Sequence, residues 1–181
     1  MEISFSEYSE DYKNDLVEVL TAGKWPFHST PIITKEKVIE QLQNGYFTGT
    51  GKRTFLIFDE SRVIGVIRLF DLGNGPEDDE TPLFDIKIKE EKRDMGIGKK
   101  ALKWLTDLVF TEYPNKNRFE ATTRADNIAM RKVFESCGFM KEAHYRQAWP
   151  DEHGNKYDCA GYSILRGDWR NNTKTEVKWD S

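Results

Sequence analysis

The sequence predicts an α+β fold in which helices flank a mixed, mostly antiparallel sheet, and three observations support it. Short apolar and polar runs alternate, as is typical of half-buried strands. Other segments repeat apolar residues at helical spacing. Two pairs of strand-like runs surround short turn sequences and predict hairpins. With 181 residues, 38% hydrophobic and 13% aromatic, the chain is long enough to bury the core of a single domain.

The first half of the chain predicts a strand, two helices and a hairpin. Residues 3–8 alternate as a strand, and apolar residues then recur at helical spacing over 12–20. Thr34 has the character of a helix N-cap, and the apolar face over residues 38–42 continues the helix that it starts. Two β-rich runs around a short turn make residues 53–72 a hairpin.

The second half predicts two strand–helix pairs and a terminal hairpin. Residues 83–88 and 118–123 read as strands. An apolar stripe over residues 97–109 predicts a helix that the following Tyr-Pro stops, and a further helix spans 127–138, with Asn127 at its N-cap. The runs on either side of PDEHGN, within residues 139–165, predict the hairpin.

Composition limits the location and the partners that we expect. One domain covers residues 1–170, and a polar C-terminal tail covers 171–181. The net charge of -4 and a pI near 5.5 argue against binding to nucleic acid or to an anionic membrane. The apolar runs are too short to span a bilayer, and the opening residues lack the regions of a signal peptide. These features predict a cytoplasmic protein, in which Cys137 and Cys159 are buried thiols rather than zinc ligands or a disulfide.

The segment RDMGIGKKAL, Arg93 to Leu102, places two glycines at the start of a predicted helix. The free N–H groups of a first helical turn and the positive end of the helix dipole favour an anion there. The alternative is that Gly96 only ends a loop. A nucleotide-binding P-loop is excluded, because Arg93 and Lys100 stand where it needs a glycine and a Ser or Thr.

A dinucleotide-binding motif is the second interpretation of these glycines. GIGKKA satisfies the pattern G-x-G-x-x-[GA], and Glu120 lies roughly 20 residues on, where a ribose-binding acid is needed. However, residues 89–95 separate the predicted strand from Gly96, whereas that motif follows its strand almost directly.

Two motifs together resemble the GNAT superfamily of acyl-CoA-dependent N-acetyltransferases. RDMGIG fits the pattern [RQ]-x-x-G-x-[GA], and NIAMRKVFESCGF, Asn127 to Phe139, follows one strand later. The order of elements over nearly the whole chain is also that of the superfamily. The ending YSILRGDW, Tyr162 to Trp169, more narrowly resembles the branch of ribosomal-protein N-terminal acetyltransferases.

The resemblance implies acetyl-CoA as co-substrate, no metal, and a set of contacts to coenzyme A. The pyrophosphate would bind backbone amides of Arg93, Asp94, Met95, Gly96, Ile97, Gly98 and Lys99. The pantetheine arm would pair with the main chain of Ile86, Lys87 and Ile88, as an added strand does. Asn127 would hydrogen-bond near the sulfur, and Met130 and Phe134 would pack along the arm. The alternatives are that Asn127 is only an N-cap and that Met130 and Phe134 are core residues.

The chemistry implied is direct attack of a neutral amine on the thioester, which needs a base for the ammonium proton. Glu120 is the first choice for this base, and its alternative role is a structural ion pair with Arg118 or Arg124. Asp85 and His28 are the other candidates, and the alternative for His28 is a hydrogen-bonded loop histidine. Many members have a tyrosine acid where Phe134 stands, so here Tyr145 or water would protonate the thiolate, or it would leave unassisted.

The acceptor would be a small amine or a protein N-terminus. Trp25, Phe27 and His28 lie where this family builds its acceptor wall, and with the acidic loop of residues 76–80 they would favour a cationic, partly apolar acceptor. A non-catalytic acyl-CoA sensor is the alternative from another class, and turnover with a panel of amines discriminates the two. A monomer or a homodimer through the last strands is expected.

Overall fold

Two antiparallel sheets form the framework of the protein. The computed structural model describes residues 2–74, 78 and 80–179. The first sheet has the order β1-β2-β3-β4, made of β1 (Ile3–Glu7), β2 (Arg53–Asp59), β3 (Arg62–Phe70) and β4 (Leu83–Ile88). The second has the order β5-β7-β6, made of β5 (Arg118–Arg124), β6 (Met140–Pro150) and β7 (Lys156–Leu165).

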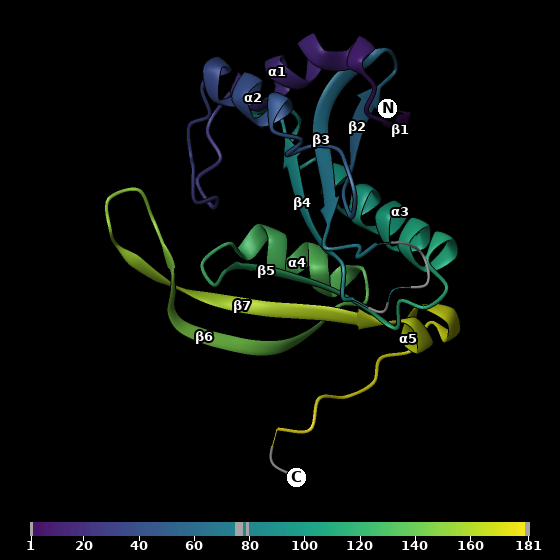
Figure 1. Ribbon diagram of the computed structural model, residues 1–181. Coiled ribbons are helices and arrows are strands. Elements are labelled where there is room, and N and C mark those ends of the chain that lie inside the picture. The colour runs from purple at the N-terminus through teal and green to yellow at the C-terminus, as the bar shows by residue number, and fades with distance from the viewer. Residues whose placement is uncertain (1, 75–77, 79, 180–181) are drawn as a thin grey trace.

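Helices cover both faces of the first sheet and one face of the second (Figure 1). One face of the four-stranded sheet packs against α1 (Lys13–Thr21) and α2 (Lys35–Gln43), and the other packs against α3 (Ile97–Glu112). The three-stranded sheet packs against α4 (Ile128–Ser136). This arrangement confirms the α+β class. Within the described ranges, no helix is long and apolar enough to cross a membrane.

The helix signals in the sequence act as predicted. The side chain of Thr34 accepts a hydrogen bond from the N–H of Lys37 at 3.2 Å and caps α2. Asn127 accepts one from the N–H of Met130 at 3.2 Å and caps α4. Gly138 follows α4 with a φ of 88°, which favours glycine.

Three short helices are not predicted by the sequence: the 3₁₀ turns Glu10–Tyr12 and Glu90–Lys92, and α5 (Arg166–Asn171). The guanidinium of Arg166 explains the position of α5, because it donates to three carbonyl oxygens at and beyond the end of α3, those of Phe110, Tyr113 and Lys116. Asp168 is buried and accepts hydrogen bonds from Thr173 and Thr175. The beginning of the polar tail is therefore held against the domain.

The two sheets come together between β4 and β5. The N–H of Glu120 donates to the carbonyl oxygen of Pro82 at 3.4 Å, and no strand pairing joins β4 to β5 over the described residues. The sequence predicts one mixed sheet here, whereas the structure has two. The N–H of Lys89, just after β4, donates to the carbonyl oxygen of Ile64 in β3. In an antiparallel ladder, every second residue directs its N–H and C=O towards the neighbouring strand. Ile86 is three residues before Lys89, so its N–H and C=O point away from β3.

Candidate active site

A cavity of about 380 Å³ lies between the two sheets. Its walls are β4, from which Asp85, Ile86 and Lys87 contribute, and β5, which contributes residues 121–123. The loop between α1 and α2, with residues 27–30, and α4 complete the lining, together with side chains from α2, β3 and β6. The cavity therefore combines an unpaired strand edge with polar side chains from segments far apart in the chain.

Three polar side chains form a chain of ion pairs at the cavity wall. Nε2 of His28 lies 2.7 Å from Oδ1 of Asp85, and Nζ of Lys87 contacts the other oxygen of Asp85. Burial opposes ionisation of Asp85, but the Lys87 ammonium and the hydrogen bond from His28 outweigh it and hold the pKa of Asp85 well below its ordinary value. Asp85 is thus a carboxylate that is a weak base and fixes the orientation of His28.

The other nitrogen of His28 has no partner. Nδ1 of His28 is buried and makes no hydrogen bond to any described residue. A neutral imidazole that donates from Nε2 carries its lone pair on Nδ1. His28 therefore presents an unused proton acceptor at the wall of the cavity.

Three residues were predicted to bind the acceptor amine. The structure places Phe27 and His28 in the cavity lining and leaves Trp25 outside it. Trp25 is buried, and its indole N–H donates to the carbonyl oxygen of Leu20 at 3.0 Å. The ring of Trp25 stands edge-on to His28 with centroids 6.4 Å apart. Trp25 supports the position of His28 rather than lining the cavity.

Sequence reasoning missed Arg68, Tyr46 and Trp149, which also line the cavity. The Arg68 guanidinium carbon lies 3.7 Å from the ring centroid of Tyr46 and 4.4 Å from that of Phe70, and Arg68 donates to the Tyr46 hydroxyl. Burial raises the pKa of Tyr46, and the charge of Asp85 adds to this while that of Arg68 opposes it. An arginine inside the apolar run VIRLF was the available signal for this group.

The glycine-containing loop before α3 is at the surface and presents free N–H groups. No described residue accepts a hydrogen bond from the backbone N–H of any residue from Asp94 to Lys99. Gly96 caps α3 with a φ of 76°, which an L side chain adopts only with strain. Met95 is half-exposed, Asp94 and Lys99 are exposed, and Ile97 is buried. This arrangement suits a bound phosphate group.

The side chain of Arg93 forms hydrogen bonds within the protein. Its Nε donates to the carbonyl oxygen of Ile88 at 3.1 Å, and its terminal nitrogen donates to that of Lys24 at 2.9 Å. Its guanidinium also lies 5.3 Å from the ring centroid of Trp25. Arg93 thus ties the loop before α3 to the loop that carries His28.

The predicted contacts on α4 all line the cavity. Asn127 caps the helix and also donates from Nδ2 to the hydroxyl of Thr123 at 3.0 Å. Phe134 is buried in the aromatic core and Met130 is partly buried against it. Tyr145 lies on β6 with 53% of its surface exposed and is not among the lining residues.

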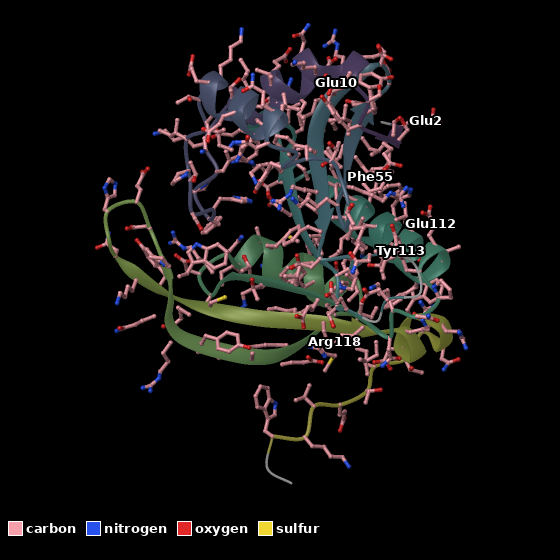
Figure 2. All side chains as sticks on the ribbon, in the orientation of Figure 1. Glu2, Glu10, Phe55, Glu112, Tyr113 and Arg118 are labelled. Atoms are coloured by element: carbon pink, nitrogen blue, oxygen red, sulfur yellow. The ribbon has the colours of Figure 1, made fainter. Side chains whose placement is uncertain are left out.

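The cavity lining also leaves out Glu120, Ile88 and the predicted pyrophosphate-binding residues 93–99. Oε2 of Glu120 lies 3.0 Å from Nε of Arg118, and Arg118 also contacts Glu142. Strand alternation puts these groups on the face of the sheet opposite α4, and Arg118 lies at the end of the sheet near α5 (Figure 2).

The acidic loop does not reach the cavity in its described part. Pro76, Glu77 and Asp79 lie outside the described residues. Asp78 accepts hydrogen bonds from the N–H groups of Asn74 and Glu80. No group of three His, Cys, Asp or Glu side chains among the described residues could hold a metal ion, and Cys137 and Cys159 are free thiols, Cys159 buried and Cys137 partly buried.

Comparison with known proteins gives consistent results. The model of the acetyltransferase (GNAT) family matches residues 16–139. A sequence search finds no matching curated protein. The spermidine N-acetyltransferase from Vibrio cholerae, solved in complex with CoA and spermine, superposes with a TM-score of 0.75 at 18% identity, over 93% of this chain and 98% of that one. A GNAT-family acetyltransferase from Bacillus anthracis superposes with a TM-score of 0.74 at 15% identity, over 92% and 96%. At these identities the two structures establish a shared fold.

Proposed function

The chain belongs to the GNAT acetyltransferase family, and from this premise we propose that it moves an acetyl group from acetyl-CoA to the primary amine of an acceptor bound in the cavity between β4 and β5. The observation that carries this proposal is the His28–Asp85 contact at the wall of that cavity. A protein that only sensed acyl-CoA would need the phosphate-binding loop, but it would have no use for a positioned base.

Coenzyme A fits the groups that the chain leaves free. We infer that the N–H groups of Asp94 to Lys99 bind the pyrophosphate and that the main chain of Ile86 pairs with the pantetheine amides, since extended ligands add to strand edges. Asn127, Met130 and Phe134 then line the arm. Acetyl-CoA supplies the thioester that the acceptor attacks.

His28 is the base in this proposal. Asp85 keeps the imidazole oriented and holds the proton on Nε2, so Nδ1 accepts a proton from the acceptor ammonium, directly or through water. The neutral amine nitrogen bonds to the acetyl carbon as the carbon–sulfur bond breaks, and the electron pair leaves on the thiolate. An N–H of β4 near Ile86 polarises the acetyl oxygen.

The leaving thiolate has no tyrosine acid at position 134. Phe134 carries no transferable proton, and the exposed Tyr145 is outside the cavity lining. We therefore assign the final proton to water, or propose that the thiolate leaves unassisted.

The deciding experiment is release of the CoA thiol, measured with acetyl-CoA and a panel of amines that includes polyamines, amino acids, amino sugars and peptides with a free N-terminus. Turnover that depends on one class of amine supports the proposal. Binding of acetyl-CoA without acetylation of any amine would instead identify the acyl-CoA sensor. A peptide as the preferred acceptor would assign a protein N-terminus.

A further inference from the structure

Arg68 is a partly buried cation of the cavity wall. None of the ion pairs among the described residues includes Arg68. Its side chain contacts the rings of Tyr46 and Phe70 and the Tyr46 hydroxyl. Stacking fixes the plane of the guanidinium and leaves most of its N–H groups available for a ligand.

Polar atoms without a hydrogen-bond partner are concentrated at this cavity. Four buried side-chain atoms of the described residues have no hydrogen-bond partner, and three of them belong to the lining: Nδ1 of His28, Nε of Arg68 and Nε1 of Trp149. The nitrogens of Arg68 and Trp149 can only donate. Because a buried donor without a partner is costly, this part of the cavity is suited to a ligand that brings acceptor oxygens.

The charges of the lining side chains also favour an anionic ligand. Its charged side chains are Lys37, Arg68, Lys87 and Asp85. Lys87 contacts Asp85, and Lys37 is paired with the exposed Glu40 at 3.0 Å. The charge that remains is the positive charge of Arg68, which disfavours binding of a polycation in the cavity.

We propose that the acceptor amine carries its own carboxylate or phosphate group, which binds the guanidinium of Arg68 while the amino group lies at His28 and Asp85. This inference rests on the proposed function and narrows its substrate. Arg68 and Asp85 are directly opposite each other on β3 and β4, so their Cβ atoms are about 5 Å apart. The anionic and amino groups of the acceptor are therefore close in its structure, as in a free amino acid, whereas spermidine or the N-terminus of a longer peptide has no such group.

The test compares matched acceptors that differ in the anionic group. The pairs are an amino acid and its primary amide, β-alanine and its amide, and aminoethyl phosphate and aminoethanol, with spermidine as the polycation. The first two pairs test a carboxylate and the third tests a phosphate. We expect the wild-type kcat/KM to favour an anionic member by roughly 10- to 100-fold.

Arg68→Met should remove that preference by lowering kcat/KM for the anionic member alone, while the Kd of acetyl-CoA stays unchanged. Arg68→Lys keeps the positive charge but lacks the planar guanidinium with its paired donors, so it should lose part of the preference for the anionic member. Arg62→Met is the matched control, because Arg62 lies on the same strand, is exposed and does not line the cavity. If Arg68→Met does not fold, the ratio of wild-type kcat/KM values for the anionic and the neutral member of each pair tests the inference by itself.

Preference for spermidine or for the amides, or an equal loss with both members of a pair in Arg68→Met, would overturn this inference and leave the acetyltransferase proposal standing. A change in acetyl-CoA affinity would assign Arg68 to the coenzyme instead. Absence of turnover with every amine would reject the proposed function itself, and with it this inference.

Discussion

Nε2 of His28 lies 2.7 Å from Oδ1 of Asp85, although the two residues are 57 positions apart in the chain. His28 comes from the loop before α2, and Asp85 is in the middle of β4. The contact forms only when that loop is docked on the sheet, and Arg93 and Trp25 support the docking. Replacing either member of the pair therefore tests a tertiary arrangement as well as a single side chain.

His28→Gln should lower kcat by roughly 10²- to 10⁴-fold, because the amide of glutamine retains a polar group but cannot accept the proton. Affinity for acetyl-CoA should remain unchanged. The defect should shrink as pH rises towards the pKa of the acceptor amine, since more of that amine is then already neutral. A rate profile against pH, with acetyl-CoA titrations on the same samples, measures both effects.

Glu120→Gln is the comparison for His28→Gln. A structural pair with Arg118 predicts near-normal rates and a lower melting temperature. A fall in kcat as large as that of His28→Gln, again rescued at high pH, would return the base assignment to Glu120.

Asp85→Asn should reduce the free energy of unfolding at neutral pH, because Lys87 then loses its carboxylate partner. The pKa of Asp85 is lowered by folding from an ordinary value of 3.8, so the folded protein binds this proton more weakly than the unfolded chain. The stabilisation is thus fully present above that value and is lost as pH falls below it.

Urea unfolding of the wild type and of Asp85→Asn from pH 7 to pH 3 measures this difference. The gap in free energy should be constant above pH ~4 and narrow below it. The exposed Asp11→Asn serves as a control and should follow the wild type throughout. A gap of the same size at pH 3 and at pH 7 would contradict the charge-based account.

Acetyl-CoA should raise the melting temperature of the wild type, because a ligand that binds only the native state stabilises it. Gly98→Glu should abolish this shift, since a carboxylate at the start of α3 repels the pyrophosphate. A Cβ at Gly98 would lie 3.7 Å from Ile88 and Val133, which is ordinary contact, so we expect the variant to fold.

Gly167→Glu is the matched control, because a Cβ at this position meets nothing within 4 Å and the residue lies on α5. Its acetyl-CoA shift should equal that of the wild type. If Gly98→Glu kept the full shift, the phosphate would bind elsewhere. Stabilisation of the wild type by NADH but not by acetyl-CoA would favour the dinucleotide-binding interpretation.

Arg166→Ala should reduce the free energy of unfolding by roughly 1–3 kcal/mol, because three carbonyl oxygens at and beyond the end of α3 lose a charged donor. Arg166 does not line the cavity, so KM should not change. Urea unfolding and steady-state kinetics test the two statements. Arg170→Ala, on the same short helix, is the control and should have little effect on either quantity.

The sequence predicts this fold well wherever a local signal decides the structure. Thr34 and Asn127 mark the helices that they cap, and the apolar patterns give strands and helices that differ from the observed bounds by a few residues. The separation of β4 from β5 has no local signal, because it depends on the distance between two strands that a helix connects. Residues 166–171 form too short a helix for periodicity to indicate it.

The catalytic candidates were harder to predict for a physical reason. Strand alternation gives the face on which a side chain lies but not its partner. The sequence therefore favoured Glu120 over Asp85 as the base, although Asp85 contacts His28 and Lys87 and Glu120 contacts Arg118. Arg68 appears in the sequence as one charge within an apolar hairpin, and only the arrangement of Tyr46 and Phe70 around it gives it a place in the cavity.

The separation of β4 from β5 also bears on how the protein avoids aggregation. An unpaired strand edge on the outside of a molecule is a template for another chain. Here the open edge of β4 faces β5 across a cavity of about 380 Å³ whose lining includes residues of α4 and Trp149 of β6. We expect this enclosure to hinder pairing with a strand of a second molecule, while the free main-chain groups of β4 stay accessible to the pantetheine arm that we propose to bind there.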